Sequence, residues 1–506
     1  MQDSDVIVIG SGIGGLCAAG LLARYGKRVI TCESHTIPGG AAHSFRRRGF
    51  EFDSGPSFYC GLRNAQSLNP LKQVLDALDQ SLQVIPYDPL GHYHFQEATF
   101  AVYSNAEMYR HQVQKITPQG AKEFQRFEER LLDLYEAMKG IPTLALRADW
   151  QVILVLLQRH LPSLAKMLPH LPLVQASVGN VMDATIQDSW VRRLIDLECF
   201  LLSGLKAHGT IAPELAFMLG ERSRAGVEYP VGGSAAIVNA LVRGLECWGG
   251  QLRLGCHVEK ILVESSKAVG VRLQNGEVLK APIVISNATI WDTYNHLLNP
   301  EDLPASYRQV AVNTPAVDSF MHLHLGIRAT KLDNLTGHHV VVHDSSQDIT
   351  TSGNTCMISI PSVWDKTLAP KGHHVVHAYT LEAFAGWERN DEYEQKKQEK
   401  AQSLYRALEK VIPDIRERVV LELIGTPLTH AHYLRRYQGT YGPAISSMGF
   451  AYAAGKGMFP STQTPIKGLY RVGDSTMPGI GVPAVAASGI LCANSLVNIQ
   501  QMAELL

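Results

Sequence analysis

The stretch that decides the fold is Asp5-Val6-Ile7-Val8-Ile9-Gly10-Ser11-Gly12-Ile13-Gly14-Gly15, close to the start of the chain. The apolar run predicts a buried strand, Gly-x-Gly-x-x-Gly predicts a tight turn, and the apolar residues from Leu16 to about Tyr25 predict a helix. In this pattern Gly10 makes the turn, Gly12 lets the backbone approach a pyrophosphate, and Gly15 lets helix and strand pack closely. The helix N-terminus supplies positive potential for phosphates.

An acidic residue stands in the register that this motif requires. Glu33 follows Gly15 by eighteen residues and ends a second predicted strand that begins at Lys27. A carboxylate there can accept hydrogen bonds from both ribose hydroxyls, and it repels a 2′-phosphate. A glycine loop alone is often only a turn, but strand, helix and acid in register predict a dinucleotide site.

A second glycine-rich segment lies near the other end, at Gly473-Asp474-Ser475-Thr476-Met477-Pro478-Gly479-Ile480-Gly481-Val482-Pro483. Two such segments, far apart in sequence and serving one ligand, suggest a flavin. No charged residue or histidine occurs between Ser475 and Ala503, which is long enough to cross a bilayer. The prolines and the polar Asn494 and Asn498 instead favour a turn followed by a buried helix from about Pro483, its N-terminus aimed at the cofactor.

Composition narrows the class of protein. A chain of 506 residues predicts two to four domain-sized units, and a net charge of −1 gives no field that would attract nucleic acid. The eight cysteines show no Cys-x-x-Cys spacing, so we expect buried, reduced thiols in a cytoplasmic compartment. The N-terminus enters the first strand directly, which predicts no targeting segment.

The nucleotide-binding signals occur in three blocks, about 1–65, 229–290 and 425–506. We expect these to form one discontinuous cofactor domain, and segments 66–228 and 291–424 to form a second, α+β unit. The middle block predicts a helix from Ser234 to Arg243 and short strands near Leu252, Val258–Val263, Val269–Leu273 and Ile283–Ser286. Asn275-Gly276 between two of these strands predicts a hairpin.

A leucine-rich stretch runs from about Trp150 to Leu173. Its apolar residues cover most helical faces and few charges interrupt them. Two interpretations remain open, a helix buried inside the protein and a helix that dips into a membrane surface.

With Gly39-Gly40-Ala41-Ala42-His43, Asp53-Ser54-Gly55-Pro56-Ser57 and the terminal Gly473-Asp474 segment in order, the chain resembles a family of flavoproteins. This is the carotenoid isomerase (prolycopene isomerase-like), phytoene desaturase and retinol saturase family, and the carotenoid isomerase branch of cyanobacteria and plastids is nearest. The resemblance covers essentially the whole length. It implies a Rossmann-like FAD domain of the glutathione-reductase and amine-oxidase type, non-covalent FAD, and a polyene substrate taken from membrane.

The resemblance also implies roles for individual residues. Ser11, Ile13 and Gly14 would line the pyrophosphate, Glu33 the adenosine ribose, Gly40 and Ala41 the loop beneath the phosphates, and the backbone of Val258 the adenine edge. Asn287 and Ala288 would end the strand below the adenosine. Pro56 and Ser57 would lie by the isoalloxazine, Gly473 and Asp474 at the ribityl or pyrophosphate end, and the amides after Gly481, at Val482 and Pro483, would face the flavin ring. Many desaturases carry arginine after the Gly-Gly pair; here Ala41, Ala42 and His43 follow, as in saturase-like relatives, which argues against desaturation without establishing saturation.

No metal site or catalytic residue is predicted. His322 and His324 would share one face of a strand, and His430 and His432 form another pair, but the sequence nominates no third ligand. Only one Gly-x-Gly-x-x-Gly follows a strand, so no nicotinamide domain is expected. Electrons would come from a quinone or reduced carrier, or the reaction is redox-neutral. The hypotheses are an FAD-dependent polyene isomerase, a net redox enzyme on the same substrates, and a carotenoid-binding flavoprotein without turnover.

Overall fold

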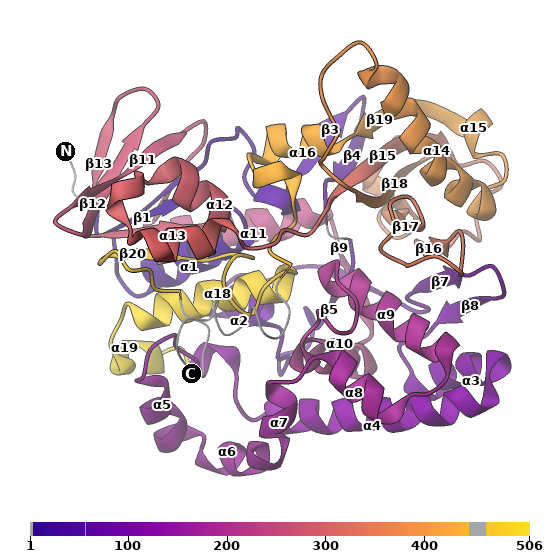
Figure 1. Cartoon of the computed structure of the whole chain (residues 1–506), viewed down its shortest axis with the longest axis horizontal. Coiled ribbons are helices and arrows are strands. Elements are labelled where there is room, and N and C mark those ends of the chain that lie inside the picture. The colour runs from indigo at the N-terminus through magenta and orange to yellow at the C-terminus, as the bar shows by residue number, and fades with distance from the viewer. Residues whose placement is uncertain (1–3, 56, 445–461) are drawn as a thin grey trace.

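A five-stranded parallel sheet forms the centre of the nucleotide-binding half (Figure 1). The computed structural model describes residues 4–55, 57–444 and 462–506. The sheet has the order β10-β2-β1-β14-β20, and every neighbouring pair is parallel. Its strands are β1 (Val6–Ile9), β2 (Val29–Cys32), β10 (Gln251–Arg253), β14 (Ile283–Ser286) and β20 (Leu469–Arg471).

The two faces of this sheet bury different layers, because successive side chains of a strand point to opposite sides. Val6 and Val8 of β1 belong to one apolar cluster and Ile7 and Ile9 to another. The first cluster includes residues of α1 (Ile13–Arg24), α2 (Pro70–Ala77), α11 (Ser234–Cys247) and α18 (Val482–Ser495). The second includes residues of β11 (Val258–Glu264), β12 (Lys267–Leu273), α12 (Ile290–Asp292) and α13 (Ala305–Val312).

Most local predictions for this half are confirmed. β12 and β13 (Val278–Lys280) pair antiparallel around the predicted turn, where Gly276 has φ of 86°. The helix expected from about Pro483 is α18, and the first helix begins at Ile13 rather than Leu16 because the glycines of the loop already lie in its first turn. Among the described residues, the structure has no helix of the length and apolar character needed to span a membrane.

A seven-stranded mixed sheet forms the second layer, in the order β19-β15-β18-β17-β16-β7-β8. Only the pair β16–β7 is parallel. On β15, Met321, Leu323 and Leu325 pack on α14 (Tyr393–Val411), so His322 and His324 point to the opposite face. The strands are β7 (Gly91–His94), β8 (Thr99–Val102), β15 (Ser319–Arg328), β16 (His338–Val342), β17 (Thr355–Ser359), β18 (His373–Glu382) and β19 (Val419–Gly425).

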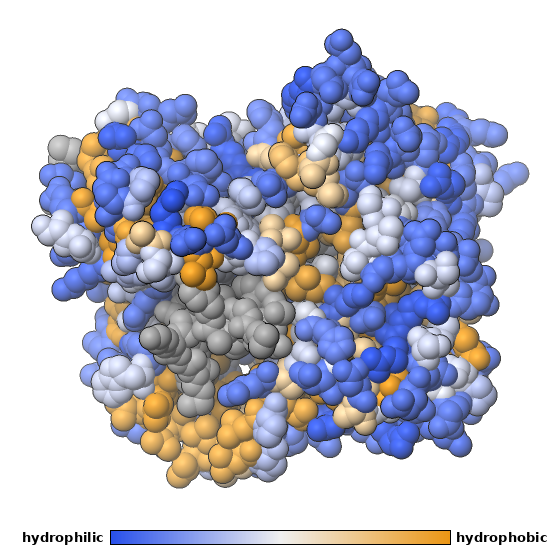
Figure 2. Space-filling model, in the orientation of Figure 1, coloured by the Kyte–Doolittle hydropathy of each residue, from blue (hydrophilic) through white to orange (hydrophobic). Residues whose placement is uncertain are grey.

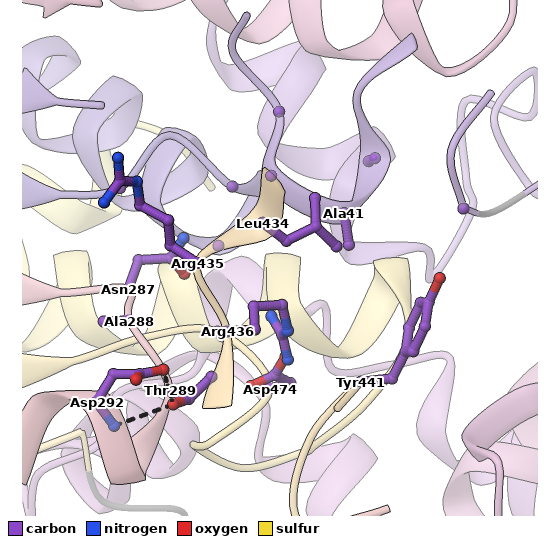
Figure 3. A pocket seen from close by; sticks show the side chains of 18 of the residues that line it. Ala41, Asn287, Ala288, Thr289, Asp292, Leu434, Arg435, Arg436, Tyr441 and Asp474 are labelled. Atoms are coloured by element: carbon purple, nitrogen blue, oxygen red, sulfur yellow. Dashed lines mark hydrogen bonds and ion pairs between the residues drawn. The ribbon is translucent and has the colours of Figure 1, made fainter. Parts of the chain in front are cut away.

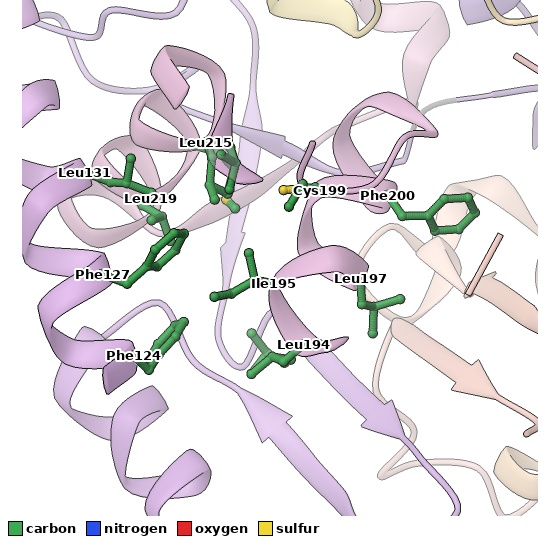
Figure 4. Packing of buried hydrophobic residues seen from close by; sticks show 14 of the residues in the cluster. Phe124, Phe127, Leu131, Leu194, Ile195, Leu197, Cys199, Phe200, Leu215 and Leu219 are labelled. Atoms are coloured by element: carbon green, nitrogen blue, oxygen red, sulfur yellow. The ribbon is translucent and has the colours of Figure 1, made fainter. Parts of the chain in front are cut away.

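A group of helices completes the second unit around an aromatic and leucine-rich core, shown in Figure 4. They are α3 (Ala106–Ile116), α4 (Pro118–Met138), α8 (Val178–Thr185), α9 (Ser189–Ser203) and α10 (Ala212–Ala225). Small sheets join the layers, namely the hairpin β3 (Ser44–Arg47) and β4 (Phe50–Asp53), and the set β5 (Tyr59–Cys60), β9 (Val227–Pro230) and β6 (Val84–Tyr87). The parallel sheet draws its strands from the three predicted blocks, whereas the domain boundaries themselves remain a prediction.

The leucine-rich stretch folds into short helices at one edge of the molecule, α5 (Val152–Arg159), α6 (Leu161–Met167), η3 (Leu168–His170) and α7 (Leu171–Val174). Val152, Val155 and Leu156 are buried, but the opposite side is exposed. Figure 2 shows this exposed side as an apolar patch at the lower edge. We call it the apolar face, and it consists of Trp150, Ile153, Leu154, Leu157, Leu161, Leu168 and Leu171.

Seven of the eight cysteines are buried, as expected, and all eight are free thiols. The prediction is wrong for Cys247, which is exposed because it lies at the C-terminal end of α11.

Candidate functional site

One large cavity, of about 1270 Å³, connects the two glycine-rich segments. Its wall contains fourteen of the predicted cofactor residues: Gly10, Gly12, Ile13, Gly14, Glu33, Gly40, Ala41, Val258, Asn287, Ala288, Gly473, Asp474, Gly481 and Val482. Because these residues come from all three blocks of the sequence, the fold brings them together as one site.

Four of the predicted residues that the structure describes do not line this cavity. Ser11 is fully buried beneath Glu33, and a Cβ at Gly15 would lie 2.3 Å from the carbonyl oxygen of Gly10, so both support the loop from behind. Ser57 lines a smaller neighbouring pocket, and Pro483, in the first turn of α18, has no N–H to offer. Pro56 lies outside the described residues.

The side chain of Asn287 holds the two glycine-rich loops against each other. Its amide nitrogen lies 2.6 Å from where a Cβ on Gly12 would be, and its amide oxygen 2.6 Å from a Cβ on Gly473. Gly10 has φ of 91°, a conformation that only glycine adopts readily. Side chains at Gly12 or Gly473 would therefore collide with Asn287, so this close approach of the two loops requires glycine at both positions.

Glu33 is held in a fixed orientation by backbone and hydroxyl donors. Its Oε2 accepts from the N–H and Oγ of Ser11 at 2.8 and 2.7 Å, and its Oε1 accepts from the N–H of His35 at 2.8 Å. The residue is 8% exposed and lines the cavity. Ser34 Oγ is a fourth donor, at 3.4 Å from Oε1. Because a carboxylate has about four acceptor positions, a ribose hydroxyl would replace the long contact from Ser34 or share a position with another donor.

The cavity fits a dinucleotide at this end. The N-termini of α1 and α18 both reach it, through Gly12 to Gly14 and through Gly481 and Val482, and neither helix has an acidic residue in its first turn. Helix N-termini present unpaired N–H groups and partial positive charge, which suits a pyrophosphate. The volume exceeds the roughly 300–1,000 Å³ typical of ligand pockets, leaving room for a second molecule.

The sequence reasoning missed a polar cluster on the same wall, which Figure 3 shows. Arg436 pairs with Asp474, and its neighbour Arg435 also lines the cavity. Thr289 caps the short α12 by accepting from the N–H of Asp292 at 3.1 Å. Consecutive arginines in the third block were the available signal, but nothing in the sequence indicated that they face Asp474.

The opposite end of the cavity is apolar, and in Figure 3 Tyr441 lies on that side. Its wall comes mainly from the second unit, through Phe200, Leu201, Leu202, Val317, Phe320, Met357 and Tyr379, and Tyr441 of the third block completes it. A smaller pocket of about 80 Å³ shares Leu201, Leu202, Met357 and Tyr379 with it. The two spaces therefore lie on either side of one apolar wall.

Four buried histidines, which we call the histidine array, lie next to this wall: His322, His324, His377 and His430. His322 Nδ1 is 2.8 Å from His377 Nε2, and His377 stacks on Tyr379 of the cavity at 4.8 Å between ring centroids. Burial lowers the pKa of His324 to about 4 and of His430 to about 3, and places the pKa of His322 and His377 well below the usual value. The array is therefore uncharged at neutral pH.

The sequence analysis found no third candidate metal ligand beside His322 and His324. In the structure His377 takes this position, because β18 places it opposite His324. The ligand nitrogens of His322, His324 and His377 lie within 4.8 Å of one another. However, His324 and His377 are stacked with ring planes 6° apart and centroids 4.3 Å apart. The nitrogen lone pair of an imidazole lies in the plane of its ring. An ion in the plane of one of these stacked rings would therefore lie outside the plane of the other. This geometry suits stacked, hydrogen-bonded rings better than a metal site. The absence of a metal remains a prediction.

The fold and the cavity define an FAD-dependent flavoprotein enzyme. The chain belongs to the family of flavin-containing amine oxidoreductases, which it matches over residues 13–497. Solved structures agree on the fold: an oxidoreductase from Methanosarcina mazei gives a TM-score of 0.62 at 20% identity, covering 96% of this chain and 99% of that one. Putrescine oxidase gives 0.64 at 15% identity, covering 98% and 99%.

Relatives in sequence fall into the three groups that the resemblance names. Chloroplastic prolycopene isomerase 1 of an Oncidium hybrid cultivar is 36% identical over 505 residues, covering 97% of this chain and 84% of the relative. A neurosporene-forming phytoene desaturase of Cereibacter sphaeroides is 28% identical, covering 97% and 94%. An all-trans-retinol 13,14-reductase of Danio rerio is 27% identical, covering 98% and 86%.

Proposed function

We propose that the protein is an FAD-dependent cis–trans isomerase of a carotenoid or related polyene. The observation that carries the proposal is the single cavity that joins a dinucleotide cradle to an apolar, aromatic chamber. A hydrocarbon chain needs such a chamber, because burying apolar surface is favourable and burying unpaired charge is costly. The prolycopene isomerase relatives, at 34–36% identity, favour isomerisation over the other chemistries of the family.

The residues of the cavity wall have separate tasks in this proposal. Glu33 holds the ribose, the first turn of α1 the pyrophosphate, and Val258 the adenine edge, while Gly481 and Val482 face the flavin ring. The bound flavin supplies the reversible electron or proton donation that lowers the order of one double bond. Leu202, Tyr379 and Tyr441 orient the polyene beside it and exclude water.

We infer that the reaction is redox-neutral. The sequence has one Gly-x-Gly-x-x-Gly that follows a strand, which is enough to bind one dinucleotide. It has no second motif of this kind that could bind a nicotinamide cofactor. Ala41 and Ala42 stand where many desaturases carry arginine, which argues against net desaturation. Any reductant would then only set the flavin to its reduced state, through a quinone or a reduced carrier.

We further propose that the apolar face docks the protein on the surface of a plastid-type or cyanobacterial membrane. Leu157, Leu161 and Leu168 are 51%, 57% and 62% exposed, which is unusual for adjacent leucines in a soluble fold. Residues 150–182 include the exposed Arg159 and Lys166 and no acidic residue. An apolar surface with cationic neighbours is typical of helices that lie on anionic lipid.

The test of the reaction is a mass balance on the product. Under anaerobic conditions, one equivalent of dithionite-reduced holoenzyme should convert many equivalents of a poly-cis carotenoid to a product of the same mass. A product that gains two hydrogens would contradict isomerisation in favour of a saturase. Loss of two hydrogens, with an oxidised acceptor consumed, would show a desaturase.

The net redox reaction is the second candidate, because the desaturase and retinol reductase relatives match the chain over 97% and 98% of its length. The same assay covers a flavoprotein that only binds carotenoid. In that case the bound pigment would be recovered unchanged in mass and geometry after flavin reduction.

A further inference from the structure

Two thiols meet at the adenosine end of the cavity. Cys32 ends β2 and Cys256 precedes β11, and both line the cavity wall. Both side chains are buried in the same cluster, and each thiol is the first cause of the other's shifted pKa. The sequence gives no sign of this pair, because the two cysteines are 224 positions apart and neither lies in a Cys-x-x-Cys motif.

The backbone fixes this arrangement. Glu33 N–H donates to the carbonyl oxygen of Arg253 at 2.9 Å, and Cys256 N–H donates to the carbonyl oxygen of Glu33 at 2.7 Å. In the parallel sheet, Arg253 of β10 is the direct neighbour of Cys32 of β2. The turn from Arg253 to Cys256 therefore lies against Glu33, the residue that follows Cys32. The main chain thus keeps the two cysteines near each other.

The environment makes one of the two thiols reactive. The interaction with Cys32 and then the positive charge of Arg253 lower the pKa of Cys256. The same interaction and burial raise the pKa of Cys32. Burial alone raises the pKa of Cys17, and it is also the main cause for other buried cysteines such as Cys356. The thiolate is the nucleophile in thiol oxidation, so Cys256 is the cysteine that reacts first.

We propose that Cys32 and Cys256 form a peroxide-oxidisable dithiol whose conversion to a disulfide weakens the hold of the cavity on FAD. The thiolate of Cys256 attacks a peroxide oxygen and becomes a sulfenic acid as the other oxygen leaves as hydroxide, which a proton converts to water. The thiol of Cys32 then displaces the hydroxyl, which forms the S–S bond and releases a second water. Hydrogen peroxide takes up both electrons.

The coupling to flavin follows from position, and it rests on the proposed placement of adenosine. Glu33, the proposed ribose ligand, follows Cys32 directly, and Val258, the proposed adenine contact, lies two residues after Cys256. A disulfide would tie the end of β2 to the segment that leads into β11. This covalent constraint acts on the backbone that carries both proposed adenosine contacts, which is how it would weaken their hold on FAD.

The test uses the holoenzyme with Cys247→Ser, which removes the exposed thiol. After hydrogen peroxide treatment and blocking of free thiols, peptide mapping should find residues 32 and 256 joined. Flavin retention should fall about tenfold, the size of losing one hydrogen bond to a charged group, and a reducing agent should restore it. Cys256→Ser should prevent the oxidation, and Cys32→Ser should leave a sulfenic acid at Cys256 that dimedone traps.

The outcomes separate this proposal from the proposed function. Free thiols at both positions after peroxide treatment, or over-oxidised Cys256 without the joined peptide, would overturn the dithiol. A complete disulfide with unchanged flavin retention would overturn the coupling. A chain that never takes up FAD would instead overturn the cofactor assignment, and peptide mapping would still report on the thiols.

Discussion

Replacing Leu161 and Leu168 with aspartate should strongly weaken binding to lipid vesicles. The two side chains are 57% and 62% exposed on the apolar face. Fully burying a leucine contributes about 1.5–3 kcal/mol, so each of these gains about 1–2 kcal/mol on entering lipid. The double variant should therefore bind roughly 30- to 1000-fold more weakly, before the cost of placing two carboxylates at the interface is counted.

Flotation with vesicles of phosphatidylcholine and anionic phosphatidylglycerol measures this loss. The matched control is Met108→Asp with Val310→Asp, which changes side chains that are 46% and 48% exposed outside the apolar face. The control should float like the wild type, and circular dichroism and flavin content should be unchanged in both variants. If the folded Leu161 and Leu168 variant floats as well as the wild type, the apolar face is not the docking surface.

Two further predictions concern the cofactor and the histidine array. Glu33→Arg should lose most of its FAD on gel filtration, because arginine offers only donors where the ribose needs an acceptor, whereas Glu264→Arg, an exposed change of the same charge, should retain it. His430→Leu should lessen destabilisation by acid. The unfolded chain binds a proton at this histidine near pH 6.5 and the folded protein only near 3, so wild-type stability is lost as pH falls below 6.5, by about 1.4 kcal/mol at pH 5.5. Unfolding midpoints at pH 7.5 and 5.5 should lie closer together in the variant, and an unchanged gap would refute this account.

The parts of the site that could be predicted are those whose signal lies within a short window. The strand, glycine turn and helix at Val6 to Arg24 occupy consecutive residues, and Asn275-Gly276 marks its own hairpin. Each of these depends on local backbone requirements, which the sequence displays directly.

The apolar wall of the cavity could not be predicted in this way. Leu202, Met357 and Tyr379 are ordinary apolar or aromatic residues of α9, β17 and β18, and nothing in their sequence neighbourhoods distinguishes them from core residues. Only the packing of the helices and the mixed sheet against the nucleotide-binding half brings them to one cavity. The same reason hides the contact between Cys32 and Cys256.

The histidine array was predictable only in part, because one of its contacts is local in sequence and the others depend on strand pairing or packing. It also bears on the chemistry of the apolar end of the cavity. The i, i+2 spacing of His322 and His324 predicts a shared face, but His377 joins them only through the register between β15 and β18. Because burial keeps these rings uncharged at neutral pH, they give the region behind Tyr379 polarity without net charge. Buried ions there would carry a large desolvation cost and would impose a strong field on any charge that develops along a bound polyene. Neutral, stacked imidazoles avoid both effects, which suits the hydrocarbon substrate of the proposed function.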